Sequence, residues 1–163
     1  MILPDKFIED RIINLDMVTP YNEAQLSPAS YDIALGGAYR MPVSNNNWSE
    51  EIKFNNMRIL PGRFYLFHSL ETIKLPDDIA AMLFMKSTYC RKGVEHLHAC
   101  WIDPGFYGQV TFEFTNCWPE PVRLEAGEIV AQLAFCMVAA TCNRTYKTGH
   151  HYQGQMGPTK PWK

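Results

Sequence analysis

The sequence predicts an all-β fold, a distorted β-barrel or jelly roll with one short helix at its N-terminus. Many short apolar runs are separated by clusters of Pro, Gly, Asn and Asp, which is typical of strands joined by turns. Residues 109–114 alternate strictly between polar and apolar side chains, as a half-buried strand does. No amphipathic helical pattern lasts long enough for βαβ units, and 163 residues suit one domain over residues 1–163.

The N-terminal helix is expected over residues 6–13. Pro4 suits the first turn of a helix, and Asp5 favours its positive N-terminal end. The apolar side of this helix, expected to pack on the rest of the domain, would consist of Phe7, Ile8 and Ile12.

Short strands follow in the first half of the chain. Residues 26–36 predict a strand and a turn, and we expect a hydrogen-bonded Asp32 to pin that turn. Residues 44–47 have the composition of a surface loop. Residues 51–60 predict two short strands around a hairpin turn at residues 55–56.

The later strands are separated by turns rich in proline and glycine. The last apolar run contains one polar residue, Gln132, whose buried amide must find a partner. Turns are predicted at 61–62, 76–78, 118–121 and 125–128, and strands over 64–73, 79–85, 122–124 and 129–138.

Residues 99–116 form the central stretch of the chain. Pro104 and Gly105 predict a tight corner between two strand-like runs, because proline presets φ and glycine permits a φ that other residues avoid. On the second run, Glu113 lies between two phenylalanines. Such a carboxylate either faces solvent or is held in a pocket for chemistry, and the residues alone leave both interpretations open.

Two further polar clusters flank this stretch. In residues 86–93, KSTYCRKG, hydroxyls and cations follow an apolar strand, which fits either an anion site or a solvated turn. His96 and His98 would share one face of a strand as a metal pair does. No third ligand lies at a suitable spacing, so packed or exposed histidines are the favoured interpretation.

Composition excludes several classes of function. The net charge of −2 gives no basic field for nucleic acid, and no apolar run approaches a membrane span. The N-terminus lacks the pattern of a signal peptide. The five cysteines are odd in number and form no CxxC pair, which favours reduced, mostly buried thiols in a cytoplasmic protein.

Motifs over most of the chain resemble the dCTP deaminase and trimeric dUTPase superfamily. IDPGFYGQVTFEF at 102–114 is similar to its third motif, and VAQL at 130–133 to its fourth. LSPASYDIALG at 26–36 and KSTYCRKG at 86–93 resemble the first and second. The tail, residues 143–163, has the composition of a flexible segment and resembles the C-terminal lid that closes over nucleotide in dCTP deaminases.

The resemblance implies a zinc-independent deaminase site. Glu113 would pass protons between water, the cytosine ring and the departing ammonia, provided that a poorly solvated pocket raises its pKa. Arg91 would keep Glu113 anionic, and Ser87 would orient the attacking water. The H-x-E and P-C-x-x-C motifs of zinc deaminases do not occur in the sequence.

The same resemblance implies the nucleotide contacts. Phe106 would stack under the sugar and leave little room for a 2′-hydroxyl, while Asp103 would bind the 3′-hydroxyl or activate water as in a dUTPase. Trp101 and Gln132 resemble the bifunctional branch of the family. His151 replaces the usual lysine and would hold phosphate less firmly. The expected nucleotide-binding residues are Lys86, Thr88, Ala99, Trp101, Asp103, Phe106, Gln132, Tyr146, His151, Tyr152 and Gln155.

The resemblance leaves several reactions open. The expected one is hydrolysis of dCTP to dUTP and ammonia. The alternatives are a bifunctional deaminase/dUTPase that releases dUMP and pyrophosphate, a plain dUTPase, and a non-catalytic nucleotide-binding regulator. Mg²⁺ would enter with the triphosphate, and dTTP is an expected inhibitor. We also expect a homotrimer in which residues 87–91 of one subunit face residues 103–113 of its neighbour.

Overall fold

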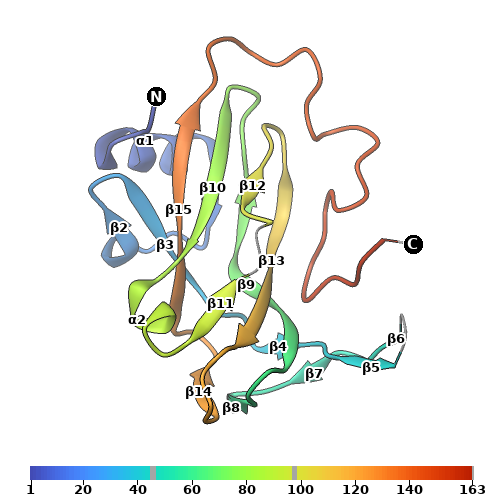
Figure 1. Cartoon of the computed structure of the whole chain (residues 1–163). Helices are drawn as coiled ribbons and strands as arrows, with labels where there is room; N and C mark the ends of the chain where they lie inside the picture. Colours follow the sequence, from blue (N-terminus) through green and yellow to red (C-terminus); the bar gives the residue numbers. More distant parts are fainter. Residues whose placement is uncertain (45–46, 97–98, 163) are drawn as a thin grey trace.

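A computed structural model of the chain describes residues 1–44, 47–96 and 99–162. It confirms the all-β prediction, because two β-sheets make up most of the molecule (Figure 1). The helices are α1 (Asp5–Leu15), the 3-10 helix η1 (Glu23–Gln25) and α2 (Ser87–Cys90). Asn45, Asn46, His98 and Lys163, on which loop, metal-pair and lid predictions fall, lie outside the described residues.

The two main sheets are built from strands distant in sequence. The four-stranded sheet has the order β1 (Val18–Thr19), β9 (Phe64–Lys74), β13 (Tyr107–Asn116) and β11 (Val94–His96). The five-stranded sheet has the order β12 (Trp101–Ile102), β10 (Ile79–Met85), β15 (Ile129–Met137), β3 (Ser30–Ala34) and β2 (Leu26–Ser27). Three two-stranded pairs complete the fold: β14 (Val122–Glu125) with β8 (Asn56–Ile59), β4 (Ala38–Tyr39) with β7 (Ile52–Lys53), and β5 (Pro42–Ser44) with β6 (Asn47–Trp48).

Side chains from both main sheets meet in one core. Tyr31 and Ile33 of β3 are fully buried, as are Phe67 of β9 and Phe112 and Phe114 of β13. The rings of Phe112 and Phe114 stack with centroids 5.4 Å apart. Full burial of one such side chain contributes about 1.5–3 kcal/mol. The core therefore fixes which face of β13 points inward, and Thr111 and Glu113 are left on the other face.

The corner at Pro104 and Gly105 carries the chain from one sheet to the other. β12 pairs with β10 through Ile102 opposite Ala81, whereas β13 pairs with β9. Gly105 has φ +84°, and a Cβ there would lie 2.9 Å from the Cβ of Thr145. The predicted corner is thus confirmed, and it brings the end of β12 and the middle of β13 to one site.

Helix α1 differs in part from its prediction. Ile8 and Ile12 are buried, but Phe7 is 51% exposed, so its assignment to the apolar side is wrong. Ile8 and Ile12 are four residues apart and share a face, whereas Phe7 lies about 100° around the helix from Ile8. Pro4 occupies the N-cap rather than the first turn.

The hairpin predicted at residues 55–56 is also wrong. Both flanking strands exist, but β7 pairs with β4 and β8 pairs with β14. Short strands carry little information about their partners. Here β14, the partner of β8, lies far away in the sequence, and β7 pairs with β4 across the intervening β5–β6 pair.

Two observations bear on the composition-based predictions. None of the five cysteines is buried, because Cys90 and Cys117 are exposed and the other three are half-buried. The expectation of mostly buried thiols is therefore wrong. In the described part of the chain, no helix combines the length and the apolar character that crossing a membrane requires.

Candidate active site

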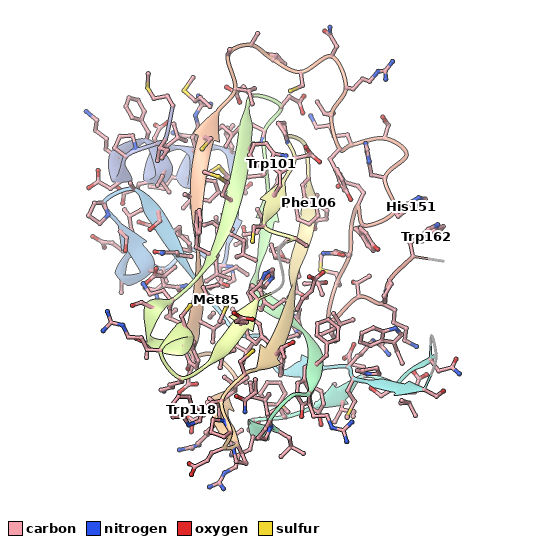
Figure 2. All side chains as sticks on the ribbon, viewed as in Figure 1. Met85, Trp101, Phe106, Trp118, His151 and Trp162 are labelled. Atoms are coloured by element: carbon pink, nitrogen blue, oxygen red, sulfur yellow. The ribbon has the colours of Figure 1, made fainter. Side chains whose placement is uncertain are left out.

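A cavity of about 240 Å³ lies between β12, β13 and the C-terminal tail. Trp101 and Phe106, both labelled in Figure 2, form part of its wall. The residues that line it are Leu66, Ala99, Trp101, Ile102, Asp103, Phe106, Val110, Thr111, Glu113, Tyr146, Tyr152, Gln155, Thr159, Lys160 and Pro161. Eight of the residues predicted from the sequence are therefore brought together within one chain.

Glu113 lies on β13 with its side chain in this cavity. It stands opposite Leu66 of β9 and is half-buried, on the face of β13 away from Phe112 and Phe114. Burial raises the pKa of the Glu113 carboxyl above its ordinary value, because a partly desolvated carboxylate loses hydration. A carboxyl group with a raised pKa accepts a proton more readily than an ordinary carboxylate, which suits a group that must both take and give a proton.

Asp103 and Trp101 lie side by side at the mouth of the cavity. The indole Nε1–H of Trp101 donates a hydrogen bond of 2.8 Å to Oδ1 of Asp103. Both side chains are exposed, and Ile102 between them is buried. The cavity therefore offers a second carboxylate that, unlike Glu113, is open to solvent.

Phe106 forms the inner wall beside the corner. It is 6% exposed, and its ring lies 5.6 Å from that of Tyr146. Tyr146 is held in turn by a 2.8 Å hydrogen bond from its backbone N–H to the carbonyl of Pro104. These rings make one side of the cavity apolar, as a site for a sugar or a flat base requires.

The C-terminal tail is tied to β13 by backbone hydrogen bonds, although its composition is typical of a flexible segment. The N–H of Gln109 donates to the carbonyl of Gln155 (2.9 Å), and the N–H of Gly154 donates to the carbonyl of Tyr107 (2.7 Å). Gly108 has φ +146°, and a Cβ there would lie 2.7 Å from the Gln155 carbonyl oxygen. The tail can approach this closely only because residue 108 has no side chain.

Two ring stacks lie within the tail. His150 stacks on Tyr146 at 4.2 Å, and His151 stacks on Trp162 at 4.1 Å (Figure 2). The backbone N–H of Trp162 also donates to the Tyr152 hydroxyl (3.0 Å). His151 is exposed and does not line the cavity, unlike its neighbour Tyr152.

Sequence reasoning missed several lining residues. Thr111 lies two positions from Glu113, so the alternation of β13 already placed both on one face. Thr159, Lys160 and Pro161 had no comparable signal, because their place depends on how the tail folds back.

The second predicted cluster, residues 86–93, lies away from the cavity that holds Glu113. None of the residues predicted in the segment 86–91 lines the cavity, and α2 lies on the opposite side of the sheets from the tail (Figure 1). Ser87, Thr88 and Arg91 are exposed. The expected turn is here a short helix, Ser87–Cys90.

The backbone of this segment is nevertheless firmly held. Lys86 Nζ lies 2.8 Å from both carboxylate oxygens of Asp32, so Asp32 fixes the start of α2 rather than the turn after β3. The Tyr89 hydroxyl donates to Glu128 at 2.6 Å. Gln132 is half-buried on the adjacent β15 and accepts a hydrogen bond of 3.3 Å from the Ser30 hydroxyl.

Potential metal ligands are dispersed. Over the residues that the structure describes, no three His, Cys, Asp or Glu side chains are grouped as they would be around an ion. His96 packs edge-on against Phe112 and Phe114, at 6.3 and 6.2 Å.

The sequence is similar to known proteins of one family. The profile of the dCTP deaminase-like family matches residues 2–138. A protein of Pseudarthrobacter chlorophenolicus named "dCTP deaminase, dUMP-forming" is 34% identical, over 98% of this chain and 93% of its own. One of Methanoculleus marisnigri with the same name is 38% identical, over 83% of this chain and 80% of its own.

Solved structures share the fold. A 2′-deoxycytidine 5′-triphosphate deaminase from Agrobacterium tumefaciens superposes with a TM-score of 0.73 at 21% identity, over 84% of this chain and 48% of that longer chain. A dUTPase from Streptococcus mutans superposes with a TM-score of 0.51 at 19% identity, over 76% of this chain and 93% of its own.

Proposed function

Because this chain belongs to the dCTP deaminase-like family, we propose that it converts dCTP and two waters to dUMP, ammonia and pyrophosphate. The relatives named dUMP-forming favour this reaction over the release of dUTP. The observation that carries the proposal is the half-buried Glu113, with its raised pKa, in a cavity walled by aromatic rings.

Deamination would proceed through Glu113. Its carboxylate takes a proton from water, and the hydroxide adds to C4 of cytosine while the proton passes to N3. Glu113 then takes the proton of the new hydroxyl and gives it to the amino group. The C4–N bond breaks, ammonia leaves and the C4 carbonyl forms. A single carboxyl group suits these transfers because burial raises its pKa, which makes the carboxylate a better proton acceptor.

A second copy of the chain would complete this site. Ser87 and Arg91 are exposed on α2 and do not line the cavity of their own chain. In a homotrimer, α2 of one copy would face Glu113 of the next. Arg91 would then lower the pKa of Glu113 and keep it anionic at rest, and Ser87 would orient the water.

Release of pyrophosphate would follow in the same site. Water must attack the α-phosphorus and break its bond to the bridging oxygen, with pyrophosphate leaving. Asp103 is the carboxylate available to bind the sugar or to help this water, while Trp101 and Gln132 fit the bifunctional branch. Mg²⁺ would be held mainly by the triphosphate, since the described acidic side chains form no cluster of three.

Product analysis tests the proposal. The purified protein is incubated with dCTP and Mg²⁺, and ammonia, dUMP, dUTP and pyrophosphate are measured together. We expect equimolar ammonia, dUMP and pyrophosphate. Ammonia with dUTP and no pyrophosphate would mean a deaminase alone, and no product would mean a nucleotide-binding regulator. Supplying dUTP tests for a plain dUTPase, and adding dTTP tests the expected inhibition.

A further inference from the structure

Trp101 and Asp103 form a pair that the reaction scheme above does not explain. They lie two residues apart at the end of β12, so their side chains point to the same side while Ile102 between them is buried. The indole N–H reaches Oδ1 of Asp103 at 2.8 Å. Both residues line the cavity that holds Glu113.

An exposed aspartate beside a ligand site needs a partner if it is to keep one orientation. In the part of the chain that the structure describes, the hydrogen bond to the Asp103 carboxylate comes from Trp101. An indole nitrogen only donates, so Trp101 occupies one carboxylate oxygen and adds no acceptor to the site. The other oxygen keeps its lone pairs for a hydroxyl group of the ligand.

Both ends of this pair are anchored through the backbone. Trp101 stands opposite Met82 of β10, and the carbonyl of Cys100 accepts a hydrogen bond of 2.8 Å from the N–H of Leu83. The carbonyl of Asp103 accepts from the N–H of Phe106 at 3.2 Å within the corner. The indole therefore starts from a fixed strand position, and its hydrogen bond favours one orientation of the Asp103 carboxylate.

We infer that Trp101 is a positioning residue, which aims the free oxygen of Asp103 at the 3′-hydroxyl of the substrate's deoxyribose. This inference rests on the proposed function, because that function supplies a deoxynucleotide. The structure assigns Trp101 a role through Asp103, separate from any stacking of its ring. Loss of the Trp101 indole would weaken the hydrogen bond between Asp103 and the 3′-hydroxyl and leave the proton transfers at Glu113 unchanged.

The test compares dCTP with 2′,3′-dideoxycytidine 5′-triphosphate. A hydrogen bond to a charged group is worth about a 10- to 100-fold effect. The wild-type kcat/KM should therefore fall by about that factor when the 3′-hydroxyl is missing. Trp101→Phe keeps an aromatic ring but removes the donor. In this variant, kcat/KM for the dideoxy nucleotide should be lower than kcat/KM for dCTP by only about threefold or less. Trp118→Phe is the matched control, because Trp118 is also about half exposed and lies in a turn outside the cavity.

Asp103→Asn provides a second readout. If Trp101 acts through Asp103, adding Trp101→Phe to Asp103→Asn should change kcat/KM by less than about twofold. The inference is overturned if Trp101→Phe lowers kcat/KM for both nucleotides by the same factor. It is also overturned if Trp101→Phe lowers kcat/KM as much in the Asp103→Asn protein as in the wild-type protein. Binding of the two nucleotides to the Glu113→Gln protein gives the same comparison without turnover. Failure of the wild-type protein to release ammonia from dCTP would instead overturn the proposed function.

Discussion

The Glu113 cavity and the segment from Lys86 to Arg91 differ in how complete each is within one chain. The cavity has an aromatic wall, a tail bonded across it and a carboxyl group whose pKa is raised by burial. The segment has a rigid backbone, but its hydroxyl and guanidinium groups point to solvent.

In the proposed homotrimer, this difference would decide what each chain contributes to a site. Asp32 and Glu128 hold the ends of α2 in place, so its exposed side chains are presented in a fixed arrangement. Because the backbone of α2 is already held, mainly the side chains lose conformational freedom when they meet a partner. We infer that each copy forms the cavity by itself, and that its α2 completes the active site of a neighbouring copy.

The largest expected effect comes from Glu113→Gln. The amide has nearly the same shape but cannot take a proton from water, so ammonia release from dCTP should fall at least about 10³-fold. The Kd for dCTP, measured by titration calorimetry, should change by less than about threefold. Retained deamination would remove Glu113 from the mechanism.

Arg91→Ala should have the next largest effect. Losing a cation beside Glu113 in the assembled protein should lower kcat/KM about 10- to 100-fold. The pKa of Glu113 should then rise, because burial would act without a compensating charge, and the acid limb of the kcat/KM profile should move to higher pH. Lys92→Ala, at the neighbouring exposed position, is the control. An unchanged acid limb would contradict a role for Arg91 at Glu113.

Gly108→Ala should affect the tail. A Cβ at this position would meet the Gln155 carbonyl oxygen at 2.7 Å, so the tail must move away from β13. We expect KM for dCTP to rise about 3- to 10-fold with a smaller change in kcat. Gly127→Ala is matched to it, since Gly127 also has a positive φ but a Cβ there meets nothing within 4 Å. Equal KM values in the two variants would show that the docked tail does not help to bind substrate.

The smallest effect is on stability. Burial raises the pKa of Glu113 in the folded state, so the folded protein binds more protons than the unfolded chain between the two pKa values. The free energy of unfolding therefore decreases as the pH rises from the pKa of Glu113 in the unfolded chain to its pKa in the folded protein. In the Arg91→Ala protein, where no cation offsets the burial, Glu113→Gln should therefore raise Tm slightly at pH 8 and leave it unchanged at pH 4. A lower Tm at pH 8 would mean that ionised Glu113 stabilises the fold.

Sequence reasoning succeeded where the pattern is local. The alternation along β13 predicts that Glu113 lies on the face of the strand away from the buried phenylalanines. Pro104 and Gly105 by themselves predict the corner. Strand partners could not be predicted in this way, because β7 and β8 pair with β4 and β14 instead of with each other, and β14 is distant in sequence.

The candidate site shows the same limit. Tyr146, Tyr152 and Gln155 were expected at the cavity from family motifs, but Lys160 lines it only because backbone hydrogen bonds fold the tail across β13. The contact from Trp101 to Asp103 depends on rotamers, which no sequence pattern specifies.

Mixing two impaired variants tests most directly whether the cavity and α2 of one site come from different copies. Glu113→Gln and Arg91→Ala chains are refolded together in equal amounts, and ammonia release from dCTP is compared with that of each variant alone. If each site joins the cavity of one copy to α2 of another, random mixing should restore about one quarter of wild-type activity. Activity that stays at the sum of the separate variants would contradict a site shared between chains.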